Sequence, residues 1–357
     1  MYGEHDVTIE VRGARRAERP ALCRLTDTAF DAEGHGPSLA SPCESVANSH
    51  LDPYDRPANT RLLLADREPV SVVHVAERDA YACGVRVHFG FIAMVATHPA
   101  HRRRGYMRQL MAEAERYMRG RGFSYAVLFG RFGTYAPIGW RWCDEKRAAL
   151  ASTYAVPCRA ESSAGTTVRA ATEHDVTFLS RVYRSRYGMR FGPVVRSHEY
   201  WRRWSLGCEW NGAYLMVCDG AGPIGYFHAN GDSVDEIGWR GSGEEIPERV
   251  LRALSAYGET NGTRTLSLWL DEADDPAIGA LGRAFGSVPR PFTGPSGQPV
   301  CSSDPRAYLP EDKPDQVGYM VKFLNPGPGI LANVVSTDAL LDVMAHRSWM
   351  CLDGDSM

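Results

Sequence analysis

The chain has 357 residues, of which 44% are hydrophobic and 23% charged, and its formal net charge at neutral pH is −3. This composition is typical of a globular protein with room for two ordinary domains. The small negative charge argues against a general nucleic-acid-binding protein, and no run of about 18 apolar residues that would span a membrane is present. The nine cysteines are scattered without a CxxC pair, which favours free thiols in a reducing cytoplasm over disulfides or a zinc site.

The first half of the sequence predicts strands and helices in alternation. A strand over residues 7–11 precedes a helix over 18–30, and a hairpin is expected at 62–76 with its turn at Asp66–Pro69. A stretch rich in glycine, proline and serine, residues 31–60, separates the helix from the hairpin. A loop of this length in a compact domain usually has a function, and we expect it to cover a substrate.

Residues 91–111 are the most informative segment, with the sequence FIAMVATHPAHRRRGYMRQLM. An apolar run ending at Val95 predicts a buried strand, His98–His101 ends it, and a helix is expected to begin near Gly105. The start of such a helix presents unpaired backbone amides and a positive dipole end, and Arg102–Arg104 add charge. This pattern predicts a phosphate-binding turn, with Gly105 allowing a pyrophosphate close to the backbone. A basic surface turn without a ligand is the alternative.

A second patterned segment follows about thirty residues later. Ser124–Phe129 predicts another buried strand, after which Tyr135 stands four residues before the pair Gly139-Trp140. The position of Tyr135, between the strand and this pair, makes it a candidate for a functional role. The alternative is a core tyrosine that holds the turn.

The second half repeats the order of elements found in the first. Residues 151–166, poor in large apolar side chains, are expected to be a linker, and a strand and a helix are predicted at 167–169 and from 172 onward. Further elements are a hairpin at 214–228, a strand at 235–239, a helix at 248–257 and strands at 266–270 and 317–323. This order predicts a mixed α/β protein that contains the same fold twice.

The pattern Arg102-x-x-Gly105-x-Met107 resembles the acetyl-CoA signature Q/R-x-x-G-x-G/A of the GNAT superfamily of acyltransferases. Met107 departs from it, since the family has a small residue there. The run THPAHRRRG at residues 97–105 resembles that of the enhanced-intracellular-survival aminoglycoside acetyltransferases. Those proteins carry two GNAT folds and a third domain, for which about thirty residues after Phe323 are too few.

The resemblance implies two GNAT folds of unequal function. It predicts a catalytic, acetyl-CoA-binding domain at residues 1–150, a linker at 151–166, a degenerate domain that shapes the acceptor site at 167–325 and a tail at 326–357. After Trp239 the second half has RGSGEE, whose acids would repel a pyrophosphate. We therefore expect one coenzyme site in each chain.

The resemblance also implies roles for individual residues. The coenzyme is expected to contact the strand end and the turn through Val95, Thr97, Arg102, Arg103, Arg104, Gly105, Tyr106 and Met107. In the family a tyrosine placed like Tyr135 lies near the coenzyme sulfur, which makes it the expected general acid.

The general base is less well defined. Many GNAT proteins place a glutamate on the fourth strand, but no acid occurs here between Arg86 and Arg102. His88 is the nearest titratable group on that strand, and His74 on the preceding hairpin is a second candidate. Transfer by positioning alone, without a dedicated base, is the third possibility.

The second half is dense in aromatic residues with acids near them in the sequence. Such a surface would suit an acceptor with several ammonium groups, through charge pairing and cation–π contacts. A core with a solvated acidic edge is the alternative. The aromatic residues are Tyr200, Trp201, Trp204, Trp210, Trp239 and Trp269, and the acids are Asp235, Glu236, Asp271, Glu272, Asp274 and Asp275.

We therefore predict an N-acetyltransferase that moves an acetyl group from acetyl-CoA, as co-substrate, to an amine of a small molecule such as an antibiotic or a natural-product intermediate. The alternatives are a longer-chain acyl-CoA acyltransferase of a glycosylated natural product, a protein-modifying enzyme and a non-catalytic coenzyme-binding protein. No metal, nucleic acid or membrane partner is expected, and assembly into a homo-oligomer is left open.

Overall fold

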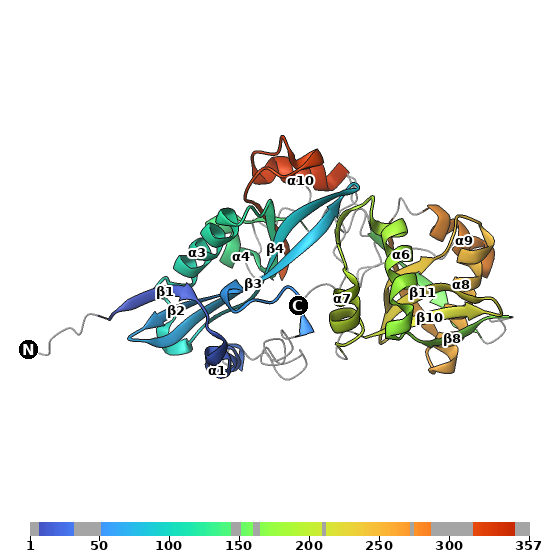
Figure 1. Ribbon diagram of the computed structural model, residues 1–357, viewed down its shortest axis with the longest axis horizontal. Helices are drawn as coiled ribbons and strands as arrows, with labels where there is room; N and C mark the ends of the chain where they lie inside the picture. The colour runs from blue at the N-terminus through green and yellow to red at the C-terminus, as the bar shows by residue number, and fades with distance from the viewer. Residues whose placement is uncertain are drawn as a thin grey trace, which may run out of the picture.

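The computed structural model describes residues 7–31, 51–143, 151–159, 165–208, 212–271, 275–286 and 317–346. These residues form two mixed β-sheets flanked by helices, and the two sheets follow one another along the long axis of the molecule (Figure 1). The prediction of a mixed α/β protein with two similar sheets is confirmed.

The first sheet contains eight described strands, in the order β1-β2-β3-β4-β5-β14-β6, with β9 paired to β3. Only β4 and β5 run parallel, so both strands end at the same edge of the sheet. The strands are β1 (Ile9–Gly13), β2 (Thr60–Ala65), β3 (Glu68–Ala82), β4 (Val85–Thr97), β5 (Tyr125–Arg131), β6 (Arg141–Trp142), β9 (Phe191–Val194) and β14 (Val317–Phe323).

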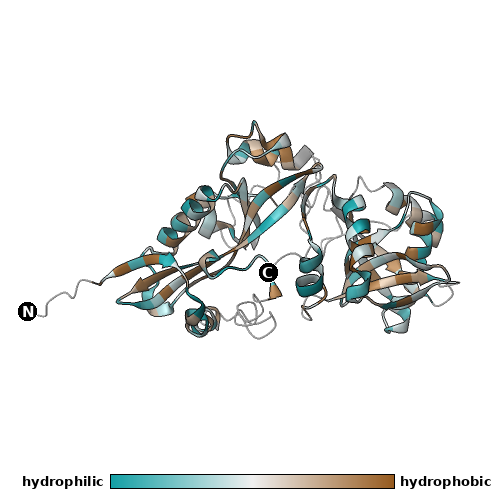
Figure 2. Ribbon diagram, viewed as in Figure 1, coloured by the Kyte–Doolittle hydropathy of each residue, from teal (hydrophilic) through white to brown (hydrophobic). Residues whose placement is uncertain are grey.

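Two helices cover opposite faces of this sheet. Because side chains alternate along a strand, Leu62 and Leu64 of β2 pack under α1 (Arg19–Asp31), whereas Leu63 packs under α3 (Tyr106–Gly120). Each helix buries apolar residues at helical spacing and turns its polar residues to the outside, as the colours of α3 in Figure 2 illustrate. The buried residues are Leu22, Leu25 and Ala29 in α1 and Leu110, Met111, Ala114 and Met118 in α3.

The second sheet has six described strands in the order β7-β13-β12-β11-β10-β8, and only β12 and β13 run parallel. Helices α8 and α9 cover one of its faces, while α6 belongs to a separate cluster that contains Tyr214 and Tyr226. The elements are β7 (Ala151–Pro157), β8 (Thr167–Ala170), β10 (Ala213–Asp219), β11 (Gly222–Asn230), β12 (Ser233–Trp239), β13 (Thr265–Asp271), α6 (Val176–Tyr187), α8 (Glu245–Thr260) and α9 (Asp275–Phe285).

The two sheets exchange one strand, which the sequence did not predict. Residues 151–157, expected to belong to a linker, form β7, which pairs antiparallel with β13 at the edge of the second sheet. Residues 317–323, expected to end the second fold, form β14 and pair antiparallel with β5 of the first sheet. Each strand takes the same place in its sheet, because each lies next to the second strand of the parallel pair. The expected division at residues 150 and 166 therefore does not separate the two sheets.

A long hairpin connects the two halves. Strands β3 and β4 extend to a turn at Cys83–Gly84, well beyond the predicted hairpin, and the end of β3 pairs with β9. The strand was predicted to end at residue 76 because Glu77, Arg78 and Asp79 interrupt its apolar pattern, whereas β3 continues to Ala82. Arg78 is buried and bonds Asp52 at 2.7 Å.

Aromatic side chains surround this ion pair. The Arg78 guanidinium lies within 6 Å of the ring centres of Tyr54, Tyr200 and Trp204, which come from the segment before β2, from α7 (His198–Tyr200) and from the π-helical turn η8 (Trp201–Ser205). Tyr200 and Trp204 are fully buried in a core that they share with Phe89 and Phe91. The interface between the halves is therefore packed like a domain interior.

None of the described helices is long and apolar enough to cross a membrane. The cysteines within the described ranges are all free thiols. Cys208 lies in the shared core, where burial raises the pKa of its thiol to about 12. Such a thiol packs as a small apolar side chain and is unreactive.

Removal of β14 should unfold the first sheet, because β5 and β6 would lose their common partner. We expect a chain truncated before Val317 to show no cooperative thermal transition for this sheet by circular dichroism. In the full chain, Met320→Ala should lower the free energy of unfolding by about 2–5 kcal/mol, since this side chain is fully buried. Val335→Ala, at a position 76% exposed, is the control and should change little. Unchanged melting of the truncated chain would contradict the exchange.

Candidate functional site

Strands β4 and β5 part at the edge where both end. They pair from Phe89 to Ile92, but beyond Ile92 the ladder stops although β4 continues to Thr97. On the β3 side, Met94 and Val95 together oppose Val73, because the register shifts between Val72 and His74. Met94 has a φ of +49°, and such a bulge bends a strand away from its neighbour. The parted strands enclose a groove of about 810 Å³.

The turn that follows β4 has two residues with left-handed backbone. Arg103 has a φ of +64° and Gly105 a φ of +79°, and α3 begins directly afterwards. A β-carbon at Gly105 would contact nothing within 4 Å, so in this structure the glycine serves the backbone conformation. His98 stabilises the start of the turn by accepting a hydrogen bond from the amide of Ala100.

The amides of this turn are available to a ligand. Gln109 is the first residue of α3 whose amide bonds within the helix, to the carbonyl of Gly105. Unpaired amides at the positive end of a fifteen-residue helix are suited to binding an anion. Within the described ranges, no partner is found for the amides of Arg103, Arg104, Gly105, Tyr106, Met107 and Arg108.

The three arginines of the turn differ in role. Arg102 donates to the carbonyl of Thr97 at 3.2 Å and to that of Ala29 in α1 at 2.7 Å, so it fastens the turn to the rest of the domain. Arg103 and Arg104 are exposed, and Arg103 lines the groove whereas Arg104 does not.

Every residue predicted to contact the coenzyme, except Arg104, lines the groove. The groove also receives contributions that were not predicted from the sequence, from the end of α1, the first turn of α3 and the end of β5. Arg108 in the first turn of α3 and Arg131 at the end of β5 are basic, and this charge is the sequence signal that could have indicated two of these contributions. The missed residues include Ala29, Phe30, Arg108, Phe129, Arg131 and Thr134.

Tyr135 lies on the opposite side of the groove, at the end of the short helix α4 (Phe132–Tyr135). Its ring rests on Gly130, where a β-carbon would come within 2.5 Å of the ring. Its carbonyl accepts a hydrogen bond from the amide of Trp140, a fully buried residue, and Gly139 turns the chain with a φ of +90°. The predicted Gly139-Trp140 pair thus holds the helix that carries Tyr135.

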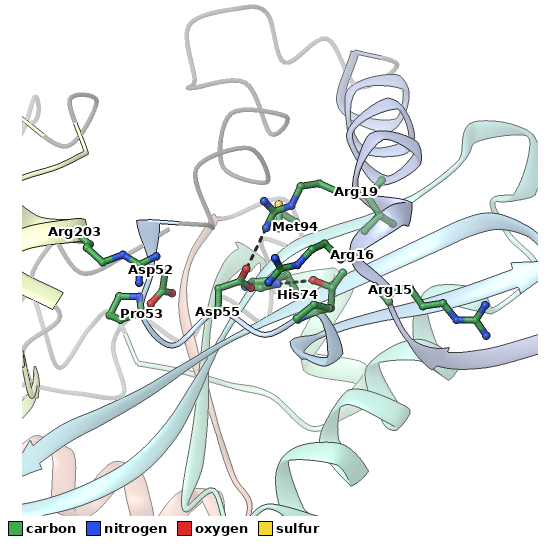
Figure 3. A pocket seen from close by; sticks show the side chains of 13 residues that line it. Arg15, Arg16, Arg19, Asp52, Pro53, Asp55, His74, Met94 and Arg203 are labelled. Carbon is green, nitrogen blue, oxygen red and sulfur yellow. Dashed lines mark hydrogen bonds and ion pairs between the residues drawn. The ribbon is translucent and has the colours of Figure 1, made fainter. Parts of the chain in front are cut away.

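A second cavity of about 400 Å³ lies at the β3 side of β4 (Figure 3). Its walls come from the turn before α1, the segment before β2, Thr60, His74 and Arg203. Met94 lines both this cavity and the groove. The part of the expected covering loop that is described, from residue 51 onward, supplies Asp52 and Asp55, while residues 32–50 lie outside the described ranges.

Residues 10–143 match the family described as acetyltransferase (GNAT) domain. This segment is a GNAT domain. No curated protein matches the sequence.

Solved structures resemble the whole described fold. A GCN5-related N-acetyltransferase from Kribbella flavida has a TM-score of 0.59 at 16% identity, covering 89% of this chain and 72% of that one. A GCN5-related N-acetyltransferase from Anabaena variabilis also reaches 0.59, at 12% identity, over 89% and 73%. Eis1 from Mycobacterium abscessus has a TM-score of 0.49 at 16% identity, over 75% and 67%. At these identities the first two likenesses show the fold alone, which is consistent with two GNAT-like folds.

The second GNAT-like fold lacks the features of the coenzyme turn. Its parallel pair, β12 and β13, is registered only at Ser233 and Val234, and α8 begins with acids at Glu245 and Glu248. Acids at the positive end of a helix occupy the site that a phosphate would need. The expectation of a single coenzyme site per chain remains a prediction supported by this difference.

The acids and aromatics expected to bind a polycationic acceptor belong in part to the core. Glu236 is buried, is paired with Arg196 through both oxygens at 3.1 and 2.7 Å, and accepts from Tyr226 at 2.6 Å. Trp201 is also fully buried. Trp210, Glu272 and Asp274 lie outside the described residues, and the structure does not describe the side chains of Asp271 and Asp275.

His88 lies away from the groove and the cavity of the GNAT domain. Its ring nitrogens are 3.0 Å from Asp79 and 3.3 Å from Glu77. Burial lowers the pKa of His88, but the hydrogen bonds to Asp79 and Glu77 outweigh this effect and raise it to about 9. A histidine that is protonated at neutral pH cannot take a proton from the acceptor, so this geometry disfavours His88 as general base.

His74 lines the second cavity and is buried. Burial, with the charges of Arg78 and Arg19, lowers its pKa to about 3. It is therefore neutral at pH 7 but far too weak a base to deprotonate an ammonium group. Its ring can orient a ligand by hydrogen bonding.

Loss of the two outer arginines of the turn should weaken acetyl-CoA binding. We expect Arg103→Asn with Arg104→Gln to lower the affinity about tenfold or more in isothermal titration, because charge-assisted bonds to phosphate would be lost. Asn is chosen at Arg103 because it tolerates a positive φ. Arg102→Gln should also lower the melting temperature, and Arg116→Gln, exposed on α3, is the control. Equal effects of the turn variants and the control would rule out this phosphate site.

His88 should make stability depend on pH. Its folded pKa of about 9 exceeds the ordinary value near 6.5, so its stabilising contribution is complete below pH 6.5 and is lost as the pH rises through 9. Urea unfolding at pH 6.5 and 9.5 should therefore show a smaller fall in stability for His88→Gln than for the wild type. The comparison with the wild type is needed because the pKa of His228 is also raised. An equal fall in the free energy of unfolding of both proteins would show that the ion pairs of His88 do not cause it.

Proposed function

We propose that the chain transfers an acetyl group from acetyl-CoA directly to the amine of a small molecule. The observation that carries this proposal is the meeting of two cavities at Met94, one on each side of β4. The groove between β4 and β5 suits the donor, and the second cavity suits the acceptor. Membership of residues 10–143 in the GNAT acetyltransferase family supports acetyl-CoA as the donor.

The residues of the groove fit acetyl-CoA in two respects. The unpaired amides of the turn, with Arg103 and Arg108 beside them, would hold the pyrophosphate. Beyond Ile92, β4 stays paired with β3 but has no partner on the side that faces β5, so backbone groups on that side can pair with the amides of the pantetheine arm. Such a strand amide would also polarise the thioester carbonyl.

The proposed chemistry is one displacement. The acceptor nitrogen attacks the thioester carbonyl carbon, a carbon–nitrogen bond forms, and the carbon–sulfur bond breaks. Tyr135 supplies a proton to the leaving thiolate, and the proton lost by the amine passes to water. Neither of the two candidate histidines is suited to be the base, because His88 is paired and His74 is too weak.

A thiol-release assay with acetyl-CoA and a panel of primary amines tests this function. We expect release that depends on an amine, and Tyr135→Phe should lower kcat about tenfold or more while the KM for acetyl-CoA changes little. Tyr257→Phe, on α8 of the second half, is the matched control. Binding of acetyl-CoA without release for any amine would indicate a non-catalytic protein. Faster turnover of decanoyl-CoA would indicate a longer-chain acyltransferase.

A further inference from the structure

Arginines line the second cavity from both halves of the chain. Arg16 and Arg19 come from the turn before α1 and its first residue, and Arg203 reaches the cavity from η8 on the opposite side (Figure 3). The carboxylates that line the cavity are Asp52 and Asp55. The net charge that a ligand meets in the cavity therefore depends on whether these two carboxylates are already paired with arginines.

Both carboxylates already have arginine partners. Asp52 is paired with Arg78 at 2.7 Å, and the two side chains are each 1% exposed. Asp55 is paired with Arg19 at 3.2 Å. The side chain of Arg16, in contrast, has no ion pair or hydrogen bond to any described residue. The cavity therefore has an excess of positive charge.

His74 adds an unused polar atom to the same cavity. Its Nδ1 lies 2.8 Å from the hydroxyl of Thr60, whereas its Nε2 is buried without a hydrogen-bond partner in the described structure. A buried polar atom without a partner is unfavourable, and a ligand that bonds it removes this penalty. When the Thr60 hydroxyl donates to Nδ1, Nε2 carries the proton and is a donor.

The backbone adds donors of the same kind. The short turn η1 (Arg16–Glu18) leads directly into the thirteen-residue helix α1, whose positive end faces the cavity. The amides of Arg16 and Ala17 have no partner among the residues that the structure describes. The cavity thus combines a cationic side chain, a neutral imidazole and a helix start, all suited to an anion.

We propose that the acceptor amine also carries a carboxylate or phosphate group, which binds between Arg16 and His74 while the amine points toward Met94. This inference rests on the proposed acetyl transfer and narrows its acceptor class. A volume of about 400 Å³ is near the lower end for ligand pockets, so the acceptor is small. An acceptor with several ammonium groups would meet the arginines and be repelled.

Matched acceptor pairs test the anionic group. The pairs are glucosamine 6-phosphate with glucosamine, and L-leucine with L-leucinamide, while spermidine and kanamycin represent polycations. In the thiol-release assay, the anionic member should have a kcat/KM at least about tenfold higher than its neutral partner. Arg16→Gln should remove this preference by lowering the kcat/KM of the anionic member toward that of its neutral partner. Arg24→Gln, exposed on α1 outside both cavities, should behave as the wild type.

A binding experiment keeps the inference testable if none of these amines is a substrate. With saturating CoA in the groove, inorganic phosphate should raise the melting temperature of the wild type and of Arg24→Gln, but not that of Arg16→Gln. His74→Asn should weaken the effect, since Nε2 is lost. No stabilisation by phosphate, or equal stabilisation of Arg16→Gln, overturns the inference.

The two experiments separate the inference from the proposed function. If neutral or polycationic amines are acetylated as well as the anionic ones and phosphate has no effect, the anionic acceptor is wrong and acetyl transfer stands. If phosphate stabilises the protein through Arg16 but no amine causes thiol release, acetyl transfer is wrong and the anion-binding cavity stands.

Discussion

The bulge at Met94 is the constraint on which both cavities depend. A regular β4 would continue its ladder with β5 beyond Ile92, and the groove would close. Instead, two residues of β4 oppose Val73 of β3, and the strand bends. Met94 has a positive φ, a backbone conformation that residues other than glycine rarely adopt. The surrounding sheet must stabilise this conformation. A locally unfavourable backbone therefore opens the site that the proposed reaction needs.

The arginines of the chain divide into those that hold the fold and those that face a ligand. Arg78 and Arg102 satisfy groups within the protein, and the first of them also joins the two halves. Arg103 and Arg16 are exposed and lie at the groove and at the second cavity. The acids that line the second cavity are already paired with other arginines. The two proposed anion sites therefore have free positive charge, and they lie on opposite sides of β4. A donor and an anionic acceptor would then approach the same strand from opposite directions.

Local patterns predicted much of the fold but not its long-range pairing. The strand, turn and helix around Gly105 and the Gly139-Trp140 pair behind Tyr135 are local features, and the structure contains both. The exchange of β7 and β14 could not be predicted from local patterns, since each strand pairs with a partner far away in the sequence, β13 and β5 respectively. The role of Arg102 was equally hidden, because its partner in α1 is 73 residues away. The sequence makes His88 a candidate base, but the pairing of β3 with β4 brings Glu77 and Asp79 beside it, which the sequence alone does not show.

The place of β14 has a consequence for synthesis of the chain. Every described strand of the second sheet lies within residues 151–271, so that sheet can close as soon as this stretch has left the ribosome. The first sheet, although it is made first, must wait for residues 317–323 to pair with β5. Until then, the exposed edge of β5 is open to wrong partners. The half of the chain that carries the GNAT domain is therefore the last to be completed.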